Sequence, residues 1–247
     1  MMKETGIIFS TALVPQVLDG TKTVTRRLYG LERANLNPDA YHSPFPLEGF
    51  WVFHKQPSQG GEPLVTKCPY GGVGDELYVK EGWAITGRDS KRRLQVAYRA
   101  DSNPDPSHVL LPIPADIPLK ARRWIEVNQD DQEKYGDFFS KYHIWCSSLF
   151  MPKWASRIWL EIVSVRPERL QKITEEDCLK EGLKKRGFNG SALFQTDGFA
   201  DDICFVGYDL AFKQLWDSLN PKHPWDTNPW VWRIEFKIKR EGGKCGI

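Results

Sequence analysis

The sequence predicts an α+β fold in which short strands outnumber helices. Residues 230–238 place five apolar side chains at strict period two, the spacing of a strand with one buried face. Residues 157–165 are apolar on both faces, which predicts a strand in the middle of a sheet or barrel. Residues 208–219 instead repeat their apolar side chains at helical spacing and are followed by Asn-Pro. These three segments predict a strand-rich core with a helix packed beside it.

The N-terminal part of the chain predicts a strand followed by a short helix. Residues 6–9 are a short apolar run that fits a strand. Residues 11–19 predict a helix that Gly20 ends. Because Pro15 is tolerated only near the start of a helix, we expect this helix to be short.

Three further elements are predicted from local patterns. Residues 76–83 follow a Gly-Asp turn and alternate apolar with polar side chains, which predicts a half-buried strand. Residues 94–99 are expected to be its hairpin partner. Residues 173–182 have the form of a helix, with Thr174 as the N-cap, acidic residues in the first turn and Gly182 after the end.

The length of the chain suits one elaborated domain. Its 247 residues can build a sizeable core, so we expect a single domain over 1–247. Insertions without clear periodicity are expected at about 28–66, 100–145 and 184–206, where proline and glycine are frequent. Five prolines in the second insertion exclude a long helix there, and its acidic run at 130–133 fits a solvated face.

Composition excludes several classes of protein. A net charge of +2 is too small to indicate nucleic-acid binding by bulk electrostatics, so any basic patch must be local. No apolar run approaches the length of a membrane span, and we expect a cytoplasmic protein with no membrane partner. No cofactor or metal is expected, because neither the cysteines nor the histidines show metal-ligand spacing. The cysteines, expected to be reduced, are Cys68, Cys146, Cys178, Cys204 and Cys245; the histidines are His42, His54, His108, His143 and His223.

The segment 20–27, Gly-Thr-Lys-Thr-Val-Thr-Arg-Arg, is the candidate centre of function. It places Lys22 three residues before Thr25, directly after a predicted helix end. A hydroxyl with a neighbouring amine is the minimum needed for a nucleophile and its base. The same segment also fits an exposed basic turn, since lysine and arginine are mostly solvated.

Several segments together resemble the ASCH domain family of the PUA-like superfamily. They are the N-terminal strand and short helix, the G-x-K-T-x-T-x-R motif at 20–27, the Gly-Asp before residue 76, the segment 173–182 and the Trp-rich final strand. The segment 150–157, Phe-Met-Pro-Lys-Trp-Ala-Ser-Arg, also resembles longer ASCH proteins of phages and prophages. The matching parts cover about half of the chain.

This resemblance implies a small PUA-like β-barrel with flanking helices and a cleft for RNA or nucleotide ligands. One branch of the family removes the acetyl group from N4-acetylcytidine with a lysine and a threonine of this motif and a glutamate of a later helix. By this resemblance the catalytic residues would be Lys22, Thr25 and Glu181. Many ASCH domains carry a glutamate at the position of Thr25, so the threonine is the most discriminating feature.

The chemistry of amide hydrolysis leaves two roles open for Lys22. Thr25 can attack an acyl carbon only if a base takes its proton. Lys22 can serve as that base if its pKa falls from about 10.4 by roughly three units. Glu181, at a helix end where the dipole disfavours an anion, could protonate the departing amine. If Glu181 pairs tightly with Lys22, the lysine stays charged, stabilises the oxyanion, and the base is another group.

Substrate contacts are expected from neighbouring cations and aromatic rings. Arg26 and Arg27 would bind phosphate, although strand alternation allows only one of them to face the cleft. Tyr29 and Trp83, and also Trp51, could stack on a base. The expected partners are a small nucleoside and possibly RNA.

Two other functions fit the same residues. The cleft could bind RNA or a modified nucleobase without chemistry. The chain could also be a phage assembly or interaction protein. The only support for this function is that the sequence resembles proteins of phages and prophages. The sequence does not indicate an oligomeric state.

Overall fold

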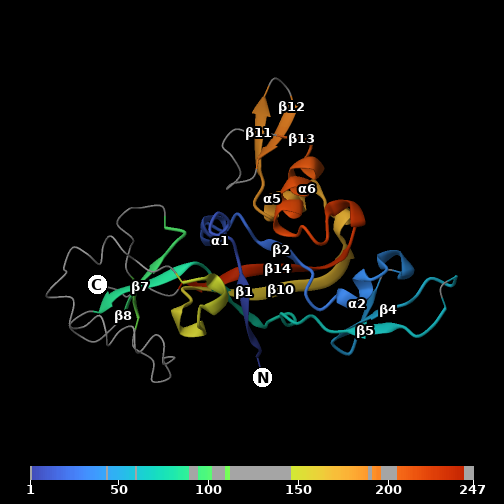
Figure 1. The fold of residues 1–247 in the computed structure, drawn as a ribbon, viewed down its shortest axis with the longest axis horizontal. Coiled ribbons are helices and arrows are strands. Elements are labelled where there is room, and N and C mark those ends of the chain that lie inside the picture. Colours follow the sequence, from blue (N-terminus) through green and yellow to red (C-terminus); the bar gives the residue numbers. More distant parts are fainter. Residues whose placement is uncertain are drawn as a thin grey trace. The chain divides into compact units, whose positions relative to one another are not determined.

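The computed structural model describes residues 2–42, 44–58, 60–88, 94–101, 109–111, 146–188, 191–195 and 205–241. These residues form a mixed α+β structure, mostly sheets with few helices (Figure 1). The chain divides into two compact units. The first comprises Met1–Thr5, Gln16–Leu77 and Leu160–Lys239; the second comprises Gly6–Pro15, Tyr78–Trp159 and Arg240–Ile247. The expectation of one elaborated domain over 1–247 stays a prediction.

The largest sheet has five strands. Their order is β1 (Glu4–Ile8), β6 (Glu76–Lys80), β10 (Ile158–Arg169), β14 (Trp230–Glu241) and β2 (Val24–Arg27). The strands predicted at 6–9, 157–165 and 230–238 are therefore confirmed, with β10 in the middle as expected. Among the described residues this sheet is open, with β1 and β2 at its edges, and does not close into the barrel that we expected.

Both long strands of this sheet bury side chains on two faces. In β10, Ile158, Leu160 and Ile162 are fully buried, whereas Val163 on the opposite face is 45% exposed, so this second face is only partly covered. In β14, Trp232 and Ile234 lie on one buried face, and Val231 and Arg233 lie on the other. Because Arg233 is a charged side chain buried in a central strand, it requires a charged partner.

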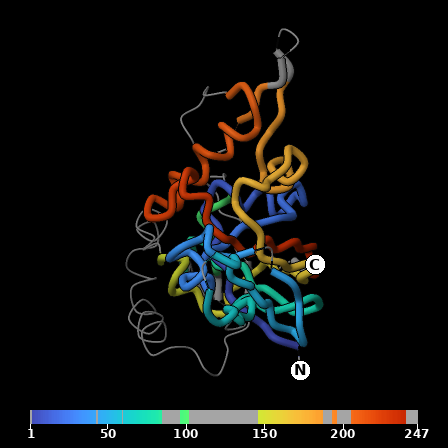
Figure 2. Tube along the Cα trace, turned by 90° about the vertical axis from the view of Figure 1, so that its right-hand side faces the viewer, coloured from blue at the N-terminus to red at the C-terminus, as the bar shows by residue number. Residues whose placement is uncertain are grey.

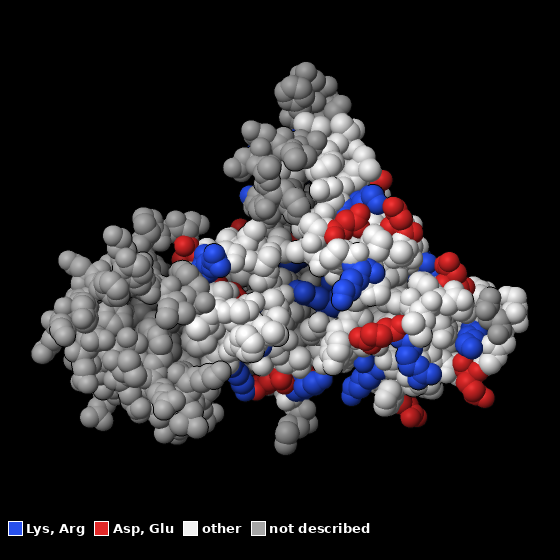
Figure 3. All heavy atoms as spheres, viewed as in Figure 1, with Lys and Arg blue, Asp and Glu red and all other residues white. Residues whose placement is uncertain are grey.

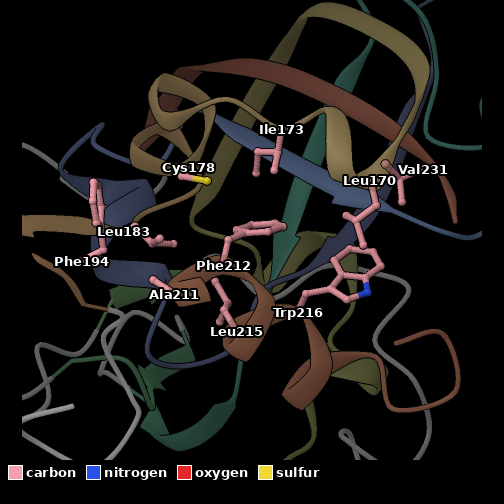
Figure 4. Packing of buried hydrophobic residues seen from close by; sticks show 10 residues of the cluster. All are labelled: Leu170, Ile173, Cys178, Leu183, Phe194, Ala211, Phe212, Leu215, Trp216 and Val231. Carbon is pink, nitrogen blue, oxygen red and sulfur yellow. The ribbon is translucent and has the colours of Figure 1, made fainter. Parts of the chain in front are cut away.

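Two helices of the first unit cover a shared apolar core. The predicted helix at 173–182 is α5 (Glu175–Lys180), whose N-cap side chain, Thr174, accepts a hydrogen bond from the Asp177 amide at 3.2 Å. Gly182 follows at φ 104°, a conformation that favours glycine. The helix predicted at 208–219 is α6 (Tyr208–Leu219). In Figure 4, Phe212 points from α6 toward Ile173 and Cys178 of this core.

Two predicted insertions contain regular structure. The segment 28–66, expected to be irregular, holds α2 (Glu32–Asn35), η1 (Pro38–Ala40) and a sheet of β3 (Phe45–Leu47), β4 (Phe50–Phe53) and β5 (Leu64–Thr66). The segment 184–206 holds β11 (Lys184–Phe188), β12 (Ser191–Gln195) and β13 (Phe205–Val206). In Figures 1 and 2, the β11–β12 hairpin extends away from the five-stranded sheet. The expectation of irregular structure was wrong for these segments, because strands of two to five residues are too short to show a clear period.

The second unit contains a further three-stranded sheet. It consists of β7 (Trp83–Arg88), β8 (Leu94–Tyr98) and β9 (Val109–Leu111), paired antiparallel in this order. The hairpin partner of 94–99 is therefore β7 and not the strand at Glu76–Lys80. Residues 76–83 were predicted as one strand, but β6 ends at Lys80 and β7 begins at Trp83, in a different sheet. Most of 100–145, with the acidic run at 130–133, lies outside the described residues.

The remaining elements are short. The N-terminal helix is α1 (Val14–Leu18), followed by Gly20 at φ 78°, which confirms the predicted short helix and its glycine stop. The 3-10 turns are η2 (Ser148–Phe150), η3 (Lys153–Ala155), η4 (Leu170–Lys172) and η5 (Trp225–Thr227). Within the described ranges, no helix is both long and apolar enough to cross a membrane.

Candidate functional site

The turn between α1 and β2 is tied to two helices through its backbone. The amide of Lys22 donates to the carbonyl of Gln16 at 2.8 Å, which fixes the turn to α1. The amide of Thr23 donates to the carbonyl of Lys180 at 2.9 Å, which fixes it to α5. These two bonds hold the motif against the end of α5, where Glu181 lies.

Lys22 is buried, with 2% of its surface exposed, and its amine is fully hydrogen-bonded. Nζ lies 2.7 Å from Oε2 of Glu181, 2.7 Å from the carbonyl oxygen of Glu181 and 3.0 Å from the carbonyl oxygen of Val24. An ammonium has three N–H donors, and three acceptors surround this one. The structure thus brings together two of the three residues expected to be catalytic.

Glu181 is the C-cap residue of α5 and is buried. Its Oε2 accepts from Lys22, and its Oε1 accepts from Nη1 of Arg26 at 3.1 Å. The two cations offset the unfavourable field that the helix end exerts on an anion. Both carboxylate oxygens are therefore held by cations.

Arg26 binds three carboxylates and is itself buried. Its Nε and Nη2 lie 3.0 and 2.7 Å from Oε1 of Glu168, and Nη2 also lies 2.5 Å from Oδ2 of Asp177. The third carboxylate is Glu181, and the guanidinium also lies 5.9 Å from the centre of the Phe212 ring. Arg26 therefore pairs with carboxylates in the interior of the first unit. We had expected it to bind a phosphate instead.

Asp177 joins a second arginine to this arrangement. Its carboxylate accepts two hydrogen bonds from Arg233, at 3.1 Å from Nε and 2.7 Å from Nη2. Burial alone would raise the pKa of Asp177, but the hydrogen bonds from Arg233 and the charge of Arg26 lower it to about 2. We call the six residues the buried charge network; its members are Lys22, Arg26, Arg233, Glu168, Asp177 and Glu181.

Thr25 is also buried, in the middle of β2 and opposite Ile234 of β14. Strand alternation places its side chain on the face of β2 opposite to that of Arg26 and on the same face as Arg27. The amine of Lys22 hydrogen-bonds the carbonyl of Val24, which belongs to the peptide that joins Val24 to Thr25. Lys22 is thus next to the backbone of the expected nucleophile.

The cations around Lys22 affect its proton affinity. Burial lowers the pKa of Lys22, Glu181 raises it, and the charges of Arg27 and Arg26 lower it further, for a net decrease. Burial likewise lowers the pKa of Arg27. The direction required of a catalytic base is therefore present at Lys22, in competition with the carboxylate of Glu181.

The expected stacking residues have different environments. The side chain of Tyr29, just beyond β2, is 66% exposed. Trp83 is buried in the second unit, pairs with Tyr98 and meets the Trp154 ring edge-to-face at 5.8 Å. Trp51 is half-buried and meets Trp232 at 6.5 Å. Tyr29 has the open ring that stacking requires, whereas Trp83 packs as a core side chain.

Sequence reasoning missed three members of the buried charge network. Asp177 was assigned to the first turn of a helix, where acids are common, and Glu168 and Arg233 drew no attention. One signal was available for Arg233, because it is the only charged residue among the first five positions of β14, between Trp232 and Ile234. A cation in a predicted central strand indicates a buried anion elsewhere in the chain.

The described residues show no metal site. No group of three or more histidine, cysteine, aspartate or glutamate side chains among them could hold a metal ion. Cys68, Cys146 and Cys178 are reduced cysteines, while Cys204 and Cys245, together with His108 and His143, lie outside the described ranges. Figure 3 shows acidic and basic side chains interspersed over the described part of one face, in keeping with the small net charge.

No protein-family model matches the chain, and neither a curated protein nor a solved structure matches it.

Proposed function

We propose that this chain is a cytoplasmic amidohydrolase of PUA-like (ASCH) type that cleaves the N4-acyl amide of N4-acetylcytidine-type nucleosides. The observation that carries the proposal is the buried contact of 2.7 Å between Nζ of Lys22 and Oε2 of Glu181, where Nζ also donates to the carbonyl of Val24, the residue before Thr25. A proton can cross such a contact without movement of heavy atoms. Amide hydrolysis needs this property, because one proton must leave the nucleophile and another must reach the departing amine.

In this mechanism the three residues form a relay. Lys22 passes a proton to Glu181 and, as a neutral amine, takes the proton of the Thr25 hydroxyl while the threonine oxygen attacks the acyl carbon. Glu181 then gives its proton to the exocyclic nitrogen as the C–N bond breaks. Lys22 then passes its new proton to Glu181 again and takes a proton from water as the water oxygen attacks the acyl carbon. Glu181 returns its proton to the Thr25 oxygen as the ester C–O bond breaks, which releases the carboxylic acid and restores the site. Arg26, which donates from Nη1 to Oε1 at 3.1 Å, holds the Glu181 carboxylate in place beside Lys22.

The position of Lys22 also suits a second role within the same reaction. If Lys22 stays an ammonium throughout, it stabilises the oxyanion and another group takes the proton of Thr25. Lys22→Arg separates the two roles, because arginine keeps the charge and cannot give up its proton. A folded Lys22→Arg protein with no turnover supports the base, and one with substantial turnover supports the oxyanion stabiliser.

The experiment that tests the proposal follows the absorbance change as N4-acetylcytidine is converted to cytidine. We expect turnover by the wild-type chain and none above background by Lys22→Met. Lys180→Met is the matched control, since Lys180 lies in the adjacent helix and pairs at 2.8 Å with the exposed Glu176. Absence of turnover by the folded wild-type chain would reject the proposal.

A second candidate function is a binding module without chemistry. It is favoured by the fact that three acceptors surround Nζ of Lys22 and that cations hold both oxygens of Glu181, an arrangement that is complete without a substrate. In this case the chain binds RNA or a modified nucleobase, with the exposed ring of Tyr29 as one contact. Salt-dependent RNA binding without turnover would select this function over the hydrolase.

A further inference from the structure

The sheet of β3, β4 and β5 has two faces of different character. Cross-strand register places Phe45 opposite Val52, Val52 opposite Val65, and Leu47 opposite Phe50, so these residues share one face. Strand alternation adds His54 and Lys67 to it. We call this the outer face of the sheet; its residues are Phe45, Leu47, Phe50, Val52, His54, Val65 and Lys67.

The opposite face anchors the sheet within the first unit. Phe53 and Leu64 are buried on it, and Trp51 meets Trp232 of β14 at 6.5 Å. Thr66 donates from its hydroxyl to the carbonyl of Gly30 at 3.2 Å, which joins β5 to the chain just after β2. Figure 1 shows β4 and β5 side by side in this part of the first unit.

The outer face exposes four large apolar side chains. Phe45 is 42% exposed, Phe50 45%, Val65 53% and Leu47 54%. Val52, at the centre of the face, is buried because Phe45 and Val65 flank it across the strands. The four exposed side chains therefore surround one covered residue and form a continuous patch, which indicates a binding surface.

The outer face also carries positive charge and lacks negative charge. Nζ of Lys67 lies 6.0 Å from the centre of the Phe50 ring. The imidazole of His54 stacks on Phe45, with ring centres 5.3 Å apart and planes inclined by 13°. None of the seven residues of the face is a carboxylate. Each exposed ring thus has a nitrogen donor beside it, an arrangement complementary to an unpaired base attached to a phosphate.

We propose that the outer face binds single-stranded nucleic acid, with bases against Phe45 and Phe50 and the backbone phosphates beside Lys67 and His54. A single strand is required because only unpaired bases offer free faces to aromatic rings. The proposal deepens the proposed function and rests on it in one respect, since it identifies the acylated cytidine as part of a polymer. Trp51 provides the structural link, because it contacts Trp232, the cross-strand neighbour of Arg27 in β2.

The test measures fluorescence anisotropy of a labelled single-stranded RNA of about ten nucleotides, a length within the range that comparable surfaces cover. We expect Phe45→Ala and Phe50→Ala each to weaken binding about tenfold, in line with the loss of one stacked base. Lys67→Gln should lower the slope of log affinity against log salt by about 0.7, the value for one phosphate contact on a single strand. Phe150→Ala is the matched control, since Phe150 is an exposed phenylalanine of the second unit, 75% exposed.

The outcomes separate this proposal from the hydrolase. Circular dichroism of each variant first establishes that it is folded. Unchanged binding in the folded Phe45→Ala/Phe50→Ala double variant overturns the proposal, as does equal binding of a matched duplex. Sedimentation that shows a dimer, lost in the double variant, makes a second copy of the chain the occupant and also overturns it. Turnover of free N4-acetylcytidine should be unaffected by these variants, so loss of RNA binding with intact turnover leaves the hydrolase standing.

Discussion

Arg26 and Arg233 lie directly opposite each other on the paired strands β2 and β14, and the carboxylate of Asp177 bridges them. Like charges at opposed positions of a sheet destabilise it. Here one anion from α5 binds both guanidinium groups, so the end of the helix is fastened to the edge of the five-stranded sheet. The same fastening places Glu181, four residues farther along the chain, at Lys22 and Arg26.

Removal of the bridging charge should strongly destabilise the first unit. Asp177→Asn leaves two buried arginines without their shared anion, and we expect a loss of about 3–5 kcal/mol in the free energy of unfolding. Urea denaturation measures this free energy of unfolding. Glu176→Gln is the control one residue away, where an exposed pair with Lys180 should contribute less than about 1 kcal/mol. Equal effects of the two substitutions would contradict the bridging role.

The same carboxylate should make stability depend on pH in the acid range. The pKa of Asp177 is about 2 in the folded chain and 3.8 ordinarily, so its stabilisation is fully present above about pH 4 and is lost as the pH falls through about 2. The expected contribution is about 2 kcal/mol. Unfolding of the wild-type chain and of Asp177→Asn, measured across this range, gives the difference. An identical pH dependence for the two proteins would show that Asp177 titrates normally.

The pair of Lys22 and Glu181 should be strongly coupled. Lys22→Met leaves a buried carboxylate without its closest cation, and we expect a cost of about 3–5 kcal/mol. Adding Glu181→Gln removes that anion, so the double variant should be more stable than the sum of the two single effects indicates, by about 1 kcal/mol or more. A double-mutant cycle in urea measures this coupling. Additive effects would show that the contact contributes nothing to stability.

A separate ion pair should stabilise the second unit. Arg157 binds both oxygens of the buried Glu81, at 2.9 and 3.0 Å, and lies 4.2 Å from the centre of the Tyr98 ring. Arg157→Lys keeps the charge but loses the two-pronged contact and the planar stacking, so we expect a loss of about 2 kcal/mol or more. Thermal unfolding of the wild-type chain and of the variant measures this loss of stability. A variant with the wild-type midpoint would mean that charge alone is sufficient at this position.

The parts of the fold that the sequence predicted well are those with a long, consistent period. Strand β14 and helix α6 each repeat a buried pattern over many residues, and both were placed correctly. Strands β3, β4 and β5 have three or four residues each, and the outer face that they share is apolar yet exposed. Neither length nor polarity pattern could identify them. Residues 81–82 separate β6 from β7, which belong to different sheets. This separation depends on tertiary structure and cannot be predicted from the local alternation of apolar and polar residues.

For the candidate site, local spacing identified Lys22 and Thr25, and a family resemblance identified Glu181. The contact between Lys22 and Glu181 joins residues far apart in the chain, which no single-sequence pattern specifies. The roles of Glu168, Asp177 and Arg233 depend on three different elements meeting at Arg26. Contacts that join several elements could not be predicted from the sequence, because each residue taken alone fits an ordinary helix turn or strand face.

The central claim is that the hydroxyl of Thr25 is the nucleophile, and the rate of N4-acetylcytidine deacetylation by Thr25→Val tests it most directly. Valine fills nearly the same space, so the fold should persist while the reacting oxygen is lost. We predict no turnover above background for Thr25→Val and near wild-type turnover for Thr23→Val, the matched substitution two residues earlier. Turnover by Thr25→Val at the wild-type rate would contradict the account.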